Sequence, residues 1–137
     1  MDMDIKELEA LIKLMDDLDP EIHEIVNSKL EKAGVETEMI LVGKEKIQGC
    51  IACHGCVKNQ NEACSIKDDP VNEWIQKIKE ADGILLGSPV HFAGVAGTMK
   101  SFLDRAFFVS LTRRFSLPLR ATFLTDDMRS TSRIPSR

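Results

Sequence analysis

Apolar residues recur every three to four positions in four stretches of the chain, a spacing that places them on one face of a helix. The first stretch predicts a helix over roughly residues 4–16. The second and third begin with Asp19-Pro20 and Asp69-Pro70, where an aspartate caps the helix and proline takes its first position. They end at Gly34 and at the Asp82-Gly83 turn. The four apolar stripes are Ile5, Leu8, Ile12 and Met15; Ile22, Ile25, Val26 and Leu30; Val71, Trp74, Ile75 and Ile78; and Met99, Phe102, Leu103, Ala106 and Phe107.

Two shorter stretches have the pattern of strands. Residues 35–42 alternate and are rich in branched side chains, and residues 83–87 form a continuous apolar run typical of a strand buried on both faces. Residues 121–125 are a further candidate strand. Helices that alternate with such strands predict an α/β fold around a parallel sheet.

Two distinctive loops follow the two main strands. One carries the cysteines, and the other, residues 88–97, is too rich in glycine, proline and small residues for a regular element. Ligands of parallel α/β sheets bind at the carboxyl ends of the strands. We therefore expect both loops to lie at the same edge of the sheet.

The cysteines are confined to one stretch of fifteen residues, Cys50, Cys53, Cys56 and Cys64. Three thiols at three-residue spacing can turn towards one centre, and a fourth can return from the end of the loop. Structural zinc more often uses two separated C-x-x-C pairs, so this spacing favours an iron–sulfur cluster. Zinc remains an alternative, as does an oxidation-sensitive loop that binds no metal. His54 could replace one thiolate, although a solvated loop residue is the plainer interpretation.

Composition and charge exclude several classes of function. The 137 residues fit one domain, and a formal charge of −4 with a pI of about 5.4 argues against nucleic acid as a partner. No segment is long enough to span a membrane. The acidic start lacks the basic and apolar regions of a secretion signal, so we expect a reducing, cytoplasmic location and free thiols rather than disulfides.

Three segments together resemble the family of NADPH-dependent FMN reductases and iron–sulfur flavoproteins. They are the cysteine stretch 50–64, the pair Asp68-Asp69, and the stretch from Ala81 through Ser88-Pro-Val-His-Phe to Arg105. The match covers roughly residues 20–109. It implies a flavodoxin-like, three-layer fold with a parallel sheet, in a domain of residues 1–110 that is followed by a divergent, arginine-rich tail, 111–137.

The resemblance also implies a function. The residues that would border the flavin of a bound FMN are Ser88, Pro89, Val90, His91 and Phe92. The four cysteines would hold the cluster, of the 4Fe-4S type. NAD(P)H would donate electrons, and a redox partner or small molecule would accept them. The resemblance implies a homo-oligomer and assigns no side chain as a catalytic acid or base. Lys100, Asp104 and Arg105 could instead form an exposed, salt-bridged helix face.

The two ends of the chain depart from this family. Its members open with a strand and a Gly/Ser/Thr-rich loop that binds the FMN phosphate, whereas this chain has acidic residues there and its first glycine is Gly34. We therefore expect neither that strand nor that loop, and an incomplete sheet. A rearranged gene product, or a short variant completed by a dimer partner, would explain the pattern. The functional alternatives are a non-enzymatic, zinc- or metal-stapled module and an inactive fragment of such a flavoprotein. A third possibility is a fragment that does not fold stably.

Overall fold

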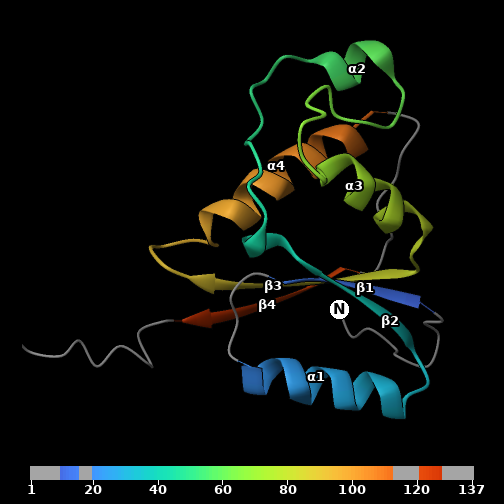
Figure 1. Ribbon diagram of the computed structural model, residues 1–137, viewed down its shortest axis with the longest axis vertical. Helices are drawn as coiled ribbons and strands as arrows, with labels where there is room; N and C mark the ends of the chain where they lie inside the picture. The colour runs from blue at the N-terminus through green and yellow to red at the C-terminus, as the bar shows by residue number, and fades with distance from the viewer. Residues whose placement is uncertain (1–9, 16–19, 113–120, 128–137) are drawn as a thin grey trace, which may run out of the picture.

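The computed structural model describes residues 10–15, 20–112 and 121–127, and its elements alternate between strand and helix (Figure 1). In chain order these are β1 (Ala10–Met15), α1 (Pro20–Lys32), β2 (Glu36–Leu41), the short 3-10 helix η2 (Val42–Lys44), α2 (Gly55–Asn59), α3 (Val71–Glu80), β3 (Gly83–Val90), α4 (Gly97–Ser110) and β4 (Ala121–Asp127).

The described strands form one parallel sheet in the order β2-β1-β3-β4. These are the first four places of the flavodoxin-like order 2-1-3-4-5. Figure 1 shows α1 on one face of the sheet and α3 and α4 on the other, which gives three layers. The predicted fold class, a flavodoxin-like α/β sheet present in part, is therefore confirmed.

The described core lies between the sheet and the layer of α3 and α4. Seven apolar residues there have at most 1% of their surface exposed: Val42, Val71, Ile75, Ile78, Met99, Phe102 and Val109. Trp74 packs its ring edge against Phe102 with ring centroids 5.8 Å apart. The stripes predicted for α3 and for most of α4 thus form this core. The exception is Phe107, which stays 43% exposed while Val109 is buried instead.

The helix predicted over residues 4–16 is wrong where the structure describes it, because residues 10–15 form strand β1. This strand pairs along its length with β2 on one side and with β3 on the other. Pairing with two neighbours outweighs a local helical spacing of apolar residues, a preference that tertiary context often overrides. The expectation that the chain lacks an opening strand is wrong for the same reason. The segment 16–19, where a phosphate loop would follow, lies outside the described residues.

The other elements follow the sequence closely. Helix α1 begins at Pro20, and Gly34 just beyond its end has a φ of +72°, the left-handed conformation that glycine adopts readily. Strand β3 runs to Val90, so Ser88, Pro89 and Val90 belong to the strand and not to the loop predicted there. The candidate strand at 121–125 is confirmed as β4. Among the described residues, none of the helices is long and apolar enough to cross a membrane.

The burial of α3 predicts how much a cavity in the core lowers the free energy of unfolding. Ile75 is 1% exposed, so Ile75→Ala should lower the free energy of unfolding by about 2–5 kcal/mol through lost burial and a residual cavity. Ile25→Ala, at a position that is 56% exposed, is the matched control and should cost much less. Urea unfolding followed by circular dichroism measures both, and equal losses would contradict this core.

Candidate functional site

The cysteine segment starts at the carboxyl end of β2 and follows α4 towards its far end. Near its start, Gly49 lies against Ser101 of α4, since a Cβ built on Gly49 would sit 3.5 Å from the Ser101 hydroxyl. All four thiols line one pocket together with residues of α4. Its lining comprises Cys50, Ile51, Cys53, His54, Cys56, Cys64, Ser65, Ile66, Arg105, Phe108 and Val109. The structure therefore gathers the predicted cysteines around a common space.

The thiols differ in exposure and surround the pocket instead of meeting at one point. Cys56 and Cys64 are buried, whereas Cys50 and Cys53 are exposed. Among the described residues, no three histidine, cysteine or acidic side chains are close enough together to hold a single metal ion. Four cysteine thiolates are the donor set of iron–sulfur clusters and of structural zinc sites, so the chemistry of the residues present fits a cluster.

The backbone of this segment is unusually bent. Five described residues other than glycine have a positive φ, and four of them are Ala52, His54, Gln60 and Glu62. The left-handed conformation costs a residue with a side chain of order 1–3 kcal/mol, and such costs concentrate at functional sites. Here the bends wrap the loop around its own thiols.

A glycine permits a close approach inside the loop. A Cβ on Gly55 would lie 1.8 Å from the Ser65 hydroxyl and 3.6 Å from the Cys53 sulfur. The Gly55 N–H and then the Ser65 hydroxyl stabilise the Cys53 thiolate and lower the pKa of this exposed thiol. Burial raises the pKa of the Cys56 thiol. Two neighbouring thiols are thus shifted in opposite directions.

Arg105 is the residue that ties the pocket to the rest of the fold, and it was missed in the sequence. Its surface is 1% exposed, so the interpretation of this position as part of an exposed, salt-bridged face is wrong. The exposed pair on that face is Lys100 with Asp104. The Arg105 Nε–H donates to the Cys64 sulfur at 3.3 Å. Nη1 donates to Gln48 O at 3.1 Å and Nη2 to Ile66 O at 3.0 Å.

Asp69 neutralises this guanidinium. Its carboxylate forms an ion pair with Arg105 Nη1 and also accepts the backbone N–H groups of Gln48 and Val71 at 3.2 and 3.3 Å. Burial alone would raise the pKa of Asp69, but the bond from Arg105 and these two N–H groups outweigh it and hold the pKa below its ordinary value. Asp69 therefore stays ionised beside the cation.

Asn72, in the first turn of α3, fixes the return of the loop. Its Nδ2 donates to the carbonyls of Cys64 and Ile66, each at 3.0 Å, and its Oδ1 accepts the Cys64 N–H at 2.7 Å. The backbone on both sides of the Cys64 sulfur is thus bound by α3 while α4 binds the sulfur itself. The run Asp68-Asp69-Pro70-Val71-Asn72, which begins four residues after Cys64, is a sequence signal for this clamp.

The predicted flavin-bordering residues lie at the carboxyl end of β3, before α4. Ser88 is fully buried; its hydroxyl donates to Pro89 O at 3.1 Å and accepts the Ala96 N–H at 2.9 Å. Val90 pairs with Val95 across the loop. His91 is exposed and Phe92 is 94% exposed. Ser88 and Pro89 shape the loop, and the rings of His91 and Phe92 are available to a ligand.

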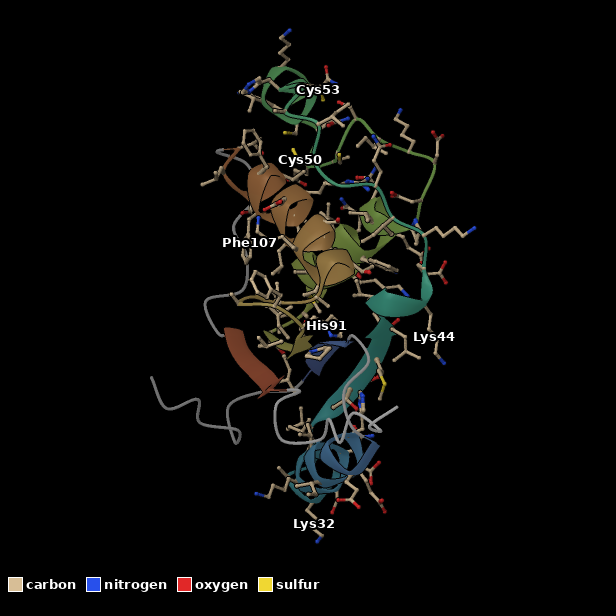
Figure 2. The ribbon with its side chains drawn as sticks, turned by 90° about the vertical axis from the view of Figure 1, so that its left-hand side faces the viewer. Lys32, Lys44, Cys50, Cys53, His91 and Phe107 are labelled. Atoms are coloured by element: carbon tan, nitrogen blue, oxygen red, sulfur yellow. The ribbon has the colours of Figure 1, made fainter. Side chains whose placement is uncertain are left out.

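The two candidate sites lie at opposite ends of α4, so the expectation that both loops share one edge of the sheet is wrong for the thiols. Ala96 precedes the helix, whereas Arg105 and Val109 line the cysteine pocket. At a rise of 1.5 Å per residue, about 14–20 Å of helix separates them. Figure 2 shows His91 near the sheet and Cys50 and Cys53 beyond the far end of the helix. His54, predicted as a solvated loop residue, is exposed but sets its ring against Phe108 at 5.7 Å.

Comparison with known proteins gives a consistent result. The sequence pattern of the family described as NADPH-dependent FMN reductase matches residues 19–123. An iron–sulfur flavoprotein of Methanocaldococcus jannaschii is 42% identical over 85 residues, which are 62% of this chain and 42% of that protein. An iron–sulfur flavoprotein of Archaeoglobus fulgidus is 35% identical over 83 residues, 61% of this chain and 39% of its own length.

A third relative extends the match. The iron–sulfur flavoprotein of Methanosarcina thermophila is 31% identical over 99 residues, 70% of this chain and 49% of that protein. The chain therefore spans less than half the length of these curated relatives.

The contact between Gly55 and Ser65 predicts a substitution that the loop cannot absorb. Gly55→Ala should lower the free energy of unfolding by about 1–3 kcal/mol, because the new methyl group would overlap the Ser65 side chain. Adding Ser65→Gly should relieve that overlap and recover part of the loss. Gly97→Ala, where nothing lies within 4 Å, is the control and should be close to neutral. Urea unfolding tests all three, and a neutral Gly55→Ala would refute the contact.

The lowered pKa of Asp69 predicts a loss of stability in acid. Above the unfolded pKa of about 3.9 the carboxylate is ionised in both states, so its full contribution to stability is present. As the pH falls from there towards the lower folded pKa, the unfolded chain takes up the proton more readily and this contribution disappears. Unfolding free energies should therefore differ most between the unaltered chain and Asp69→Asn near pH 6–7, and converge below about pH 4. A difference that does not depend on pH would contradict the assignment; Asp104→Asn, at an exposed ion pair, is the control.

Proposed function

The chain belongs to the NADPH-dependent FMN reductase family, and we propose that it is an FMN-dependent oxidoreductase whose four cysteines hold an iron–sulfur cluster. The observation that carries this proposal is the pocket lined by Cys50, Cys53, Cys56 and Cys64 at the far end of α4. Similarity to proteins named iron–sulfur flavoproteins supports the same assignment.

The chain's own residues supply the ligands and the walls of the proposed cluster site. All four thiols line the pocket, and the apolar side chains of Ile51, Ile66 and Phe108 form part of its wall. Arg105, Asp69 and Asn72 fix Cys64 through its sulfur and its backbone. Four cysteine thiolates match the usual ligands of a 4Fe-4S cluster.

The carboxyl edge between β1 and β3 is the proposed place for FMN. Flavodoxin-like sheets bind this cofactor at that switch point in the strand order. The Ala96 N–H and the Val90–Val95 pairing hold the loop after β3 in a tight turn, so that His91 and Phe92 project from it. An exposed aromatic ring beside small residues suits the flat, apolar face of a flavin.

When bound, FMN and the cluster would together convert two-electron transfer from a donor such as NAD(P)H into single-electron transfer to a redox partner or small acceptor. The protein's task in this proposal is to position both groups. No side chain of the described residues is assigned as an acid or base. We include a homo-oligomeric assembly in the proposal, as the resemblance implies.

The proposal predicts the metal and flavin content of the purified protein. After anaerobic purification with FMN present and desalting, iron and acid-labile sulfide should be present together, with a visible absorption band and retained flavin. Cys50→Ser should lose iron and sulfide, because it removes one of the four proposed ligands. This cysteine suits the test because the hydrogen bond to its sulfur is local, from the Ala52 N–H at 3.4 Å. Phe92→Ala should weaken FMN binding severalfold in a fluorescence titration.

Phe107→Ala is the matched control for the flavin, since Phe107 is also an exposed phenylalanine but lies in the far half of α4. Zinc in place of iron and sulfide would contradict the cluster and favour a zinc-stapled module. Loss of all flavin on desalting, with equal titrations for both phenylalanine variants, would contradict the FMN site.

A further inference from the structure

Arg105 contacts the cysteine pocket in a way that the fold alone does not require. Three of its nitrogens face different acceptors: Nε donates to the Cys64 sulfur, Nη1 to Gln48 O and to Asp69, and Nη2 to Ile66 O. The carboxylate that balances its charge is therefore held by a different nitrogen from the one that faces the sulfur. Its side chain is fully buried and that of Asp69 is 5% exposed.

We propose that Arg105 and Asp69 together set the reduction potential of the group held by the cysteines, with Arg105 as a positioning residue that acts through Cys64. This inference rests on the proposed function, since it assumes a cluster on the four thiolates. It assigns a role to two residues outside the ligand set.

The physical basis is the charge that reduction adds. One electron makes a cluster one unit more negative, and its potential depends on net charge, on hydrogen bonds to the sulfurs and on exposure to solvent. The Arg105 Nε–H bond and its positive charge stabilise the reduced state, while the negative charge of Asp69 opposes it. Both effects are weakly screened because the side chains are buried.

The two charges predict shifts of opposite sign. Asp69→Asn leaves Arg105 and its bond to Cys64 in place but removes the opposing charge, so the midpoint potential should rise. The double variant Asp69→Asn/Arg105→Met restores the original net charge but lacks the bond to sulfur, so its potential should fall below that of the unaltered chain. Each shift should reach about tenfold in the reduction equilibrium, which is about 59 mV for one electron.

The controls use the exposed ion pair on the same helix. Asp104→Asn and the double variant Asp104→Asn/Lys100→Met make the same changes of charge at side chains of α4 that are 45% and 61% exposed. Their potentials should stay at the value of the unaltered chain, because solvent screens exposed charges. The double variant Asp69→Asn/Arg105→Met avoids an unpaired buried charge, whereas Asp69→Asn keeps every donor of Arg105 but leaves its charge without a carboxylate. Circular dichroism checks the folding of both, and either variant that folds decides the test.

The measurement is an anaerobic redox titration followed by visible absorption and electron paramagnetic resonance, with iron and sulfide analysis of each sample. Opposite shifts in the buried pair with none in the exposed pair would support the proposal. Unchanged potentials at equal iron content would overturn it and leave the proposed function standing, including the case in which only the unfolding midpoints change. Absence of iron and sulfide from the unaltered chain would overturn both.

Discussion

A guanidinium with almost no exposed surface lies where the cysteine loop, α3 and α4 meet. Arg105 has acceptors on Gln48, Cys64, Ile66 and Asp69, which come from both ends of the cysteine loop and from the start of α3. An unpaired buried charge would cost several kcal/mol, so the loop must bring all these groups to it. The cysteine segment contains little regular structure of its own, and this set of bonds is what fixes its path.

Helix α4 connects the loop after β3 to the cysteine pocket. At its start, the Ser88 hydroxyl accepts the Ala96 N–H and so joins the helix to the end of β3. In its far half, Arg105 and Val109 line the thiol pocket. Because α4 is packed in the core, it fixes the distance between the loop that carries Phe92 and the four thiols.

The sequence predicted what local physics determines. Asp-Pro pairs and terminal glycines marked α1 and α3, and the apolar run at 83–87 marked β3. It failed at β1, whose strand conformation depends on two partners distant in sequence. It also failed at Arg105, because an arginine that directly follows an aspartate, Asp104, in a helix has the local sequence pattern of an exposed ion pair. Only the position of Asp69, 36 residues away, shows that this charge is buried.

Stability alone does not account for an ion pair in this position. A buried pair gains about as much from attraction as it loses on leaving water, and well-packed apolar residues often replace it at no cost. Such a replacement would here leave the Gln48 and Ile66 carbonyls and the Cys64 sulfur without their donors. The planar guanidinium, with donors in a fixed fork, serves all of them at once, which the single point charge of lysine cannot do. The requirement that selects arginine therefore comes from the geometry of the thiol loop, and Asp69 is needed to make that arginine tolerable in the interior.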